Sequence, residues 1–276
     1  MMSLGPIRNP KSEMRVWNFG FGISGLESSM PFLSTLRQRH RQPEIIDEPG
    51  LAPERLQEAL SGLERINWWS GSAGILWPPI RALARRVHPP PLRILDIATG
   101  AGDIPIRLWH KARRAGLAVE LAGCDRSPVA IAFARQRAQG AQAAVQFFEC
   151  DAANDQLRGD FDVLTCSLFL HHLGEREAIQ FLRRMAGVAR RAILVNDLVR
   201  TRTGFVLAYL GTRVLSASPV VHTDGPLSVE GAFTIQEVRA LAQEADLEGA
   251  TVLPRWPCRL LLSWYRTFPN EVQPAA

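Results

Sequence analysis

The sequence has few cysteines, no long apolar run and no strong excess of charge of either sign. Its four cysteines, Cys124, Cys150, Cys166 and Cys258, are widely spaced, and three lie inside apolar runs. This spacing argues against a disulfide framework or a zinc site and favours buried thiols in a reducing compartment. The longest apolar stretches fall far short of the roughly 20 residues that cross a bilayer. We therefore expect a cytoplasmic protein with no membrane span.

Charge and composition narrow the class of protein only slightly. A net charge of +5 and a pI near 9.5 would permit nucleic-acid binding. The arginines, however, are scattered and the acidic fraction is ordinary, so a nucleic-acid partner is not favoured. With 46% hydrophobic and 21% charged residues over 276 positions, the chain can bury the core of one α/β domain with additions. Nothing in the composition indicates an oligomeric state.

The chain divides into three predicted regions. Residues 1–29 lack sustained periodicity and the apolar core of a signal peptide, so we predict a disordered leader, with Met14 and Met30 as possible alternative starts. Residues 30–90 are predicted to form a helical cap, because apolar residues recur there at helical spacing. Residues 91–276 are predicted to form the main domain, with an apolar lid insertion at about 200–231.

Within the main domain, strand and helix patterns alternate, which predicts an α/β fold with a doubly wound, mostly parallel sheet. Helices open with recognisable caps, such as Ser127 before Pro128 and the Thr234/Glu237 capping box. Strands are predicted at residues 92–97, 119–124, 144–148, 161–167, 192–196, about 250–253 and 259–264, and helices at 104–115, 128–139 and 175–190.

A glycine-rich loop, "LDIATGAGDIP", follows the first predicted strand. Such a loop usually binds a nucleotide, because glycine lets the backbone approach a ligand and the next helix begins there. A dinucleotide fingerprint needs a third small residue where this chain has Pro105. A pyrophosphate would also face Asp103, and two like charges about 4 Å apart repel by roughly 1 to 4 kcal/mol. A nicotinamide-dependent dehydrogenase is therefore not favoured.

The acidic loop suits a ligand that carries adenosine and a cation. S-adenosylmethionine has both, with a sulfonium and an α-ammonium group that Asp96 and Asp103 would complement. Asp125, at the end of the second strand, is predicted to accept hydrogen bonds from the ribose hydroxyls, and Asp151 to reach the adenine amino group. Alternatives remain for three positions: the glycines could only form a tight turn, Asp125 could cap the next helix, and Asp151 could lie in a solvated turn.

Four successive motifs, "LDIATGAGD", "AGCDRSP", "ECDAA" and "FDVLTCSLFLHHL", resemble those of class I S-adenosylmethionine-dependent methyltransferases. The "HHL" is most similar to the small-molecule branch that contains the ubiquinone and menaquinone biosynthesis methyltransferases. The resemblance covers about Arg93 to Arg266. It implies a seven-stranded sheet with an antiparallel last hairpin, and contacts to the cofactor at Asp96, Gly100, Gly102, Asp125, Asp151 and Ala152.

The sequence after the fourth strand limits the acceptor. It reads "SLFL" rather than the Asp/Asn-Pro-Pro-aromatic turn of nucleic-acid amino-methyltransferases, and Cys166 lies inside the strand rather than in a Pro-Cys loop. The apolar stretch 204–221 and the tryptophans Trp68, Trp69 and Trp77 predict an apolar, aromatic acceptor. O- or C-methylation of a phenol, quinone precursor or polyketide-like compound is the leading hypothesis. A catalytically inactive, cofactor-binding regulatory or partner protein is the alternative.

Two groups of residues are candidates for catalysis. His171 and His172 directly follow an apolar strand end, where they could act on the acceptor or only bind a loop carbonyl. His222 and Asp224, in "VVHTDGPLS", could form a base oriented by a carboxylate, or merely a turn. The polar pair that ends the fifth strand, Asn196–Asp197, could contact the acceptor or cap the next loop.

Overall fold

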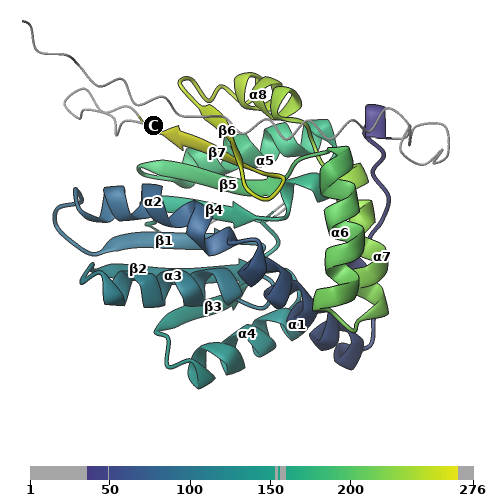
Figure 1. Ribbon diagram of the computed structural model, residues 1–276. Coiled ribbons are helices and arrows are strands. Elements are labelled where there is room, and N and C mark those ends of the chain that lie inside the picture. The colour runs from purple at the N-terminus through teal and green to yellow at the C-terminus, as the bar shows by residue number, and fades with distance from the viewer. Residues whose placement is uncertain (1–35, 49, 153–154, 156–159, 267–276) are drawn as a thin grey trace, which may run out of the picture. The chain divides into compact units, whose positions relative to one another are not determined.

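The computed structural model describes residues 36–48, 50–152, 155 and 160–266 (Figure 1). The predicted leader at residues 1–29 lies outside this part of the chain. The described residues all belong to one compact unit. The division near residue 90 into a helical cap and a main domain stays a prediction. Among the described residues, no helix is long and apolar enough to cross a membrane.

Seven strands form a single sheet in the order β3-β2-β1-β4-β5-β7-β6. Neighbours from β3 to β5 pair in parallel, whereas β7 runs antiparallel to both β5 and β6. The predicted seven-stranded, mostly parallel sheet with an antiparallel last hairpin is therefore confirmed. The strands are β1 Leu92–Ile97, β2 Val119–Asp125, β3 Val145–Glu149, β4 Val163–Ser167, β5 Ala192–Leu198, β6 Thr251–Arg255 and β7 Arg259–Tyr265.

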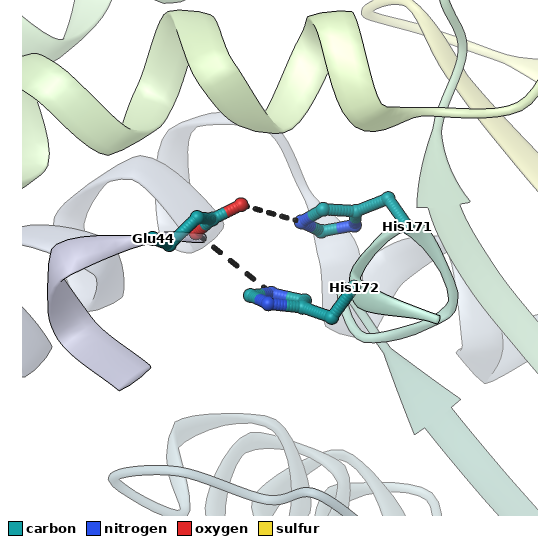
Figure 2. A group of neighbouring side chains, drawn as sticks. All are labelled: Glu44, His171 and His172. Carbon is teal, nitrogen blue, oxygen red and sulfur yellow. Dashed lines mark ion pairs between the residues drawn. The ribbon is translucent and has the colours of Figure 1, made fainter. Parts of the chain in front are cut away.

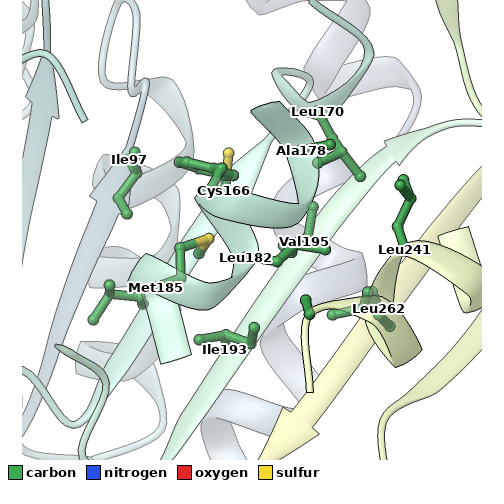
Figure 3. Close-up of a cluster of buried hydrophobic side chains, with 14 of the residues drawn as sticks. Ile97, Cys166, Leu170, Ala178, Leu182, Met185, Ile193, Val195, Leu241 and Leu262 are labelled. Atoms are coloured by element: carbon green, nitrogen blue, oxygen red, sulfur yellow. The ribbon is translucent and has the colours of Figure 1, made fainter. Parts of the chain in front are cut away.

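Helices cover both faces of the sheet. Side chains alternate along a strand, so Ile94 packs toward α2 and α3 while Leu95 packs toward α5 and α8. Figure 3 shows the second of these cores, where Leu182 and Met185 meet Ile193 and the other strand residues. These helices are α2 Ser72–Ala84, α3 Asp103–Arg114, α5 Glu175–Val188 and α8 Ile235–Glu244, with α4 Pro128–Gly140 packed on β2 and β3.

The segments outside the alternating pattern are helical and lie beyond the carboxyl ends of the strands (Figure 1). They are α1 Pro53–Trp69, the predicted lid as α6 Arg202–Leu215 and α7 Pro219–Gly231, and the short 3-10 helices η2 Ile45–Asp47 and η3 Leu170–His172. The turn suggested for "HTDGP" is wrong, because Pro219 starts α7 and Pro226 lies inside it. The strand order reverses between β1 and β4, and in open α/β sheets ligands bind beyond such a switch point.

Candidate cofactor and acceptor site

The loop between β1 and α3 turns through backbone angles that favour glycine. Gly100 has φ +53° and Gly102 has φ +70°. A Cβ on Gly102 would lie 2.6 Å from Cζ of Phe147, so this glycine also lets the loop pack against β3. Gly102 is not among the described residues that line the cavity, so its predicted contact with the cofactor stays a prediction, and what the structure shows is its part in the tight turn.

Asp96 lies at the floor of the loop and is fully buried. Its two oxygens accept hydrogen bonds from the hydroxyls of Thr99, at 2.8 Å, and Thr165, at 2.6 Å. Burial raises the pKa of the Asp96 carboxyl to about 7, although both hydroxyls lower it. The buried carboxyl therefore exchanges its proton near neutral pH, where a nearby cation would favour its charged form.

Asp103 is the first residue of α3, and its side chain is buried like that of Asp96. Burial raises the pKa of its carboxyl to about 6, against the lowering effect of Arg137. The Oδ2 atom has no hydrogen-bond partner among the described residues. A buried acceptor atom without a donor is costly, and an ammonium group would satisfy it where a phosphate would not.

Asp125, at the end of β2, joins two loops. Its Oδ2 accepts a hydrogen bond from the backbone N–H of Gly100 at 2.9 Å, and its Oδ1 accepts one from that of Ser127 at 3.0 Å. The cap of α4 is Ser127, whose hydroxyl accepts from the Ala130 N–H. Each carboxylate oxygen has two lone pairs, so Asp125 keeps acceptor capacity for a ligand hydroxyl.

A cavity of about 660 Å³ runs from this loop to the helices above it. The cofactor candidates that line it are Asp96, Gly100, Asp103, Asp125, Asp151 and Ala152. Its opposite wall is largely apolar and comes from α1 and α6, including Leu63, Trp69, Leu207 and Leu215. Trp68 and Trp77 are not among the described lining residues, so only one of the three predicted tryptophans contributes. The volume and mixed lining are typical of a small-molecule site.

A cluster of histidines and carboxylates lines another part of the same cavity. His171 is buried, and its Nδ1 lies 2.6 Å from Oδ1 of Asp197. Its Nε2 lies 3.5 Å from Oε1 of Glu44. Burial lowers the pKa of His171, but Asp197 and Glu44 outweigh it and raise that pKa to about 10. The structure thus excludes the idea that His171 only binds a loop carbonyl.

His172 has a parallel arrangement. Its Nδ1 lies 2.7 Å from Oδ2 of Asp47, and its Nε2 lies 3.8 Å from Oε2 of Glu44. Figure 2 shows Glu44 facing both imidazoles across the cluster. Arg126 binds the other oxygen of Asp47 at 2.8 Å. Both histidines therefore have a carboxylate on Nδ1 and share Glu44 on the Nε2 side.

The predicted base pair of His222 and Asp224 is wrong. Residues two apart on a helix point in different directions, and these two lie on α7. His222 Nε2 contacts the Ser216 carbonyl at 2.8 Å, while Asp224 accepts hydrogen bonds from the backbone N–H groups of Ile45 and Ile46. Neither is among the described residues that line the cavity. Asp224 instead holds the η2 segment in place.

The end of β5 and the start of β7 supply two further polar groups. Asp197 binds His171 and accepts a hydrogen bond from the neighbouring Leu198 N–H, and it is not among the described residues that line the cavity. Arg259 lines the cavity and is buried. Its Nη2 donates to Ser70 Oγ at 2.9 Å, and its Nη1 has no partner among the described residues. Burial lowers the pKa of Arg259 to about 10.

Sequence reasoning missed Glu44, Asp47 and Arg259. The first two lie in a short acidic stretch between prolines that has no helical or strand period. Their positions depend on Asp224, a contact across 178 and 179 residues of sequence. Arg259 reads as part of an ordinary strand. The signal that could have found it is an arginine at the start of an otherwise apolar strand.

The seven-stranded fold and the acidic loop after β1 agree with the predicted class, the S-adenosylmethionine-dependent methyltransferases. Residues 94–192 match a family model described as "Methyltransferase domain". The predicted class and its cofactor, S-adenosylmethionine, are therefore confirmed.

The chain is similar in sequence to two curated relatives. It is 31% identical over 131 residues to a demethylmenaquinone methyltransferase of Thermus thermophilus, covering 47% of this chain and 58% of that protein. It is 37% identical over 87 residues to a protein of the same name from Deinococcus radiodurans, covering 31% and 34%. The matched region thus spans less than two thirds of either relative.

Solved structures share the fold. An S-adenosylmethionine-dependent methyltransferase, SibL, aligns with a TM-score of 0.58 and 20% identity, covering 84% of this chain and 64% of that one. Magnesium protoporphyrin IX methyltransferase of Synechocystis, solved with bound S-adenosylhomocysteine, aligns with a TM-score of 0.51 and 19% identity, covering 80% and 91%. At this identity the likeness concerns the fold alone.

Proposed function

We propose that the protein transfers a methyl group from S-adenosylmethionine to an oxygen of an apolar, aromatic small molecule. The observation that carries the proposal is that one cavity of about 660 Å³ joins the acidic loop after β1 to an apolar wall. The names of the relatives, which refer to demethylmenaquinone and to a protoporphyrin, support a ring compound as the acceptor.

The acidic end of the cavity fits the cofactor. Asp103 offers the unpaired, buried Oδ2 for the α-ammonium, and Asp125 offers acceptor capacity for the ribose hydroxyls. Asp151 and Ala152 line the cavity where we place the adenine. When bound, S-adenosylmethionine supplies a methyl group on a sulfonium, which an acceptor oxygen attacks in line. The protein then contributes mainly proximity and alignment.

The other end of the cavity fits an apolar acceptor that carries oxygen. Leu63, Trp69 and Leu207 provide the apolar surface. Arg259 offers a buried N–H without a partner among the described residues, which would bind a phenolate or carboxylate oxygen and so orient the ring. His171 and His172 lie on the same cavity as polar groups near a reacting hydroxyl.

The test is a methylation assay with a panel of phenols and quinone precursors, in which S-adenosylhomocysteine and methylated product are measured by mass spectrometry. Asp125→Asn should weaken cofactor binding. Arg259→Met should raise KM for anionic acceptors by tenfold or more without changing cofactor affinity, since a hydrogen bond to a charged group contributes about 1.5 to 3 kcal/mol. Arg255→Met, on the same hairpin but not a lining residue, is the matched control.

Two results would count against the proposal. Cofactor binding without methylation of any compound in the panel, together with labelling of RNA, would identify a different acceptor class. Cofactor binding without any transfer would favour the alternative of an inactive regulatory or partner protein.

A further inference from the structure

We propose that Glu44, His171 and His172, which line the cavity, bind a divalent transition-metal ion such as Zn²⁺. The candidate ligand atoms of these three residues all lie within 4.8 Å of one another. Glu44 comes from the segment before α1, and the histidines come from η3 after β4 (Figure 2). Two histidines and one glutamate form a donor set that catalytic zinc sites use, with further positions open to solvent or substrate.

The separations are close to those that an ion would impose. The Nε2 atoms of His171 and His172 lie 3.5 and 3.8 Å from the two oxygens of Glu44. Ligands at about 2.0 to 2.1 Å from a tetrahedral ion lie about 3.3 to 3.4 Å apart. These two pairs, each with a different Glu44 oxygen, are within a few tenths of an ångström of that spacing. All three ligand atoms lie within 4.8 Å of one another, so the side chains would have to close further around the ion.

Each of the three ligands has an outer partner that fixes its orientation. His171 Nδ1 is held by Asp197 at 2.6 Å, and His172 Nδ1 by Asp47 at 2.7 Å. Ser228 Oγ donates to Glu44 Oε1 at 2.7 Å. Metal-bound histidines almost always donate their second ring N–H to a carboxylate, carbonyl or water, and ligating carboxylates are hydrogen-bonded in turn. The cluster has this complete outer arrangement.

The donor chemistry selects the ion. Imidazole suits zinc, iron, nickel and copper, whereas magnesium and calcium prefer oxygen ligands. Three carboxylates, Glu44, Asp47 and Asp197, surround the two imidazoles, and Arg126 pairs with Asp47. A divalent cation would thus enter a group of side chains with excess negative charge.

The position of the site suggests its use. Glu44, Asp47, His171 and His172 line the same cavity as the cofactor loop. An ion there would bind an acceptor hydroxyl oxygen and favour loss of its proton to water, which leaves an oxyanion for methyl transfer. This use rests on the proposed function, whereas binding of the ion does not, so binding is tested directly.

The experiment titrates Zn²⁺ by calorimetry and Co²⁺ by visible absorption into full-length, tag-free protein that has been stripped with a chelator. We expect one ion per chain. Glu44→Gln and His172→Gln should each weaken Zn²⁺ binding by at least tenfold, and Asp47→Asn by 10- to 100-fold, the usual effect of an outer partner. His222→Gln removes a histidine outside the cluster and should bind as the wild type does.

Thermal unfolding, measured on every variant, reports whether the fold is intact. Binding of S-adenosylmethionine, measured on the wild type, tests the proposed function separately. If Glu44→Gln does not fold, His172→Gln and Asp47→Asn still test metal binding. Their side chains are partly exposed, so we expect these two variants to fold. Absence of Zn²⁺ and Co²⁺ binding in the wild type, or equal affinity in His172→Gln and wild type, would overturn the proposal. The cluster would then be an ion-pair network that holds η2 against η3.

Discussion

Binding of S-adenosylmethionine should release about one proton from the protein near pH 6.5. Asp96 and Asp103 are buried carboxyls with pKa values raised by burial to about 7 and about 6. At pH 6.5 they are about three-quarters and one-quarter protonated, so together they hold about one proton. A cationic ligand favours their charged forms and lowers both pKa values, which expels that proton.

The same reasoning fixes how affinity depends on pH. Between pH 5.5 and 7.0, cofactor affinity should rise about 16-fold through Asp96 and about fourfold through Asp103 if both pKa values fall to the ordinary range. The α-ammonium of the ligand stays charged over this range, since an ordinary α-amino group has a pKa near 7.7 to 8.0. Cofactor affinity therefore rises with pH, because Asp96 and Asp103 are already more deprotonated before the cofactor binds.

The assay is calorimetric titration of S-adenosylmethionine in two buffers with different ionisation enthalpies, which counts the protons exchanged. Asp96→Asn should remove most of the release and the pH dependence, and Asp103→Asn the smaller part. Asp246→Asn is the control, because Asp246 is exposed, pairs with Arg183 and is not among the described residues that line the cavity. Proton uptake, or an affinity that does not change between pH 5.5 and 7.0, would refute the electrostatic account of the loop.

Three further outcomes are expected. In urea unfolding, Gly102→Ala should lower the free energy of unfolding more than Gly116→Ala. Both glycines have positive φ, which costs an alanine about 1 to 2 kcal/mol, but only at Gly102 would the Cβ lie 2.6 Å from Phe147. Equal losses of unfolding free energy would show that backbone strain alone matters. Because burial raises the Asp96 pKa from 3.8 to about 7, the wild type should lose up to about 4 kcal/mol of unfolding free energy between about pH 4 and pH 7. Asp96→Asn cannot titrate there and should lack this fall. The same pH profile in variant and wild type would contradict the assignment. Trp69→Ala should raise KM for the acceptor while leaving cofactor affinity intact, and Trp68→Ala should do neither, since only Trp69 lines the cavity.

The parts of the site that the sequence predicts are those that follow directly from local patterns. The loop after β1 and the carboxylates at the ends of β1 and β2 follow from the glycine-rich motif and from the strand and helix periods, because parallel strands end at one edge of the sheet. Six of the seven predicted cofactor residues line the cavity. Gly102 does not, because its spacing fits both a ligand contact and a turn.

The acceptor side could not be predicted in the same way. Glu44 reaches His171 across 127 positions of sequence, and no period or motif signals that contact. The prediction that His222 and Asp224 act together was wrong. The "DGP" motif is typical of a turn, but this segment is helical in α7, so the two side chains point in different directions. Long-range contacts, rather than local propensity, decide these positions.

The residues that line the cavity come partly from the region that matches the methyltransferase domain and partly from outside it. Its acidic floor lies in residues 94–192, the part that matches the methyltransferase domain, whereas Leu63 and Trp69 of α1, Leu207 of α6, and Arg259 lie outside it. The two regions share one sheet, since β7 pairs with β5, but the apolar wall comes from helices α1 and α6, which supply none of the strands of that sheet. Changes in α1 and α6 can therefore give a new acceptor specificity while the cofactor-binding loop after β1 is kept.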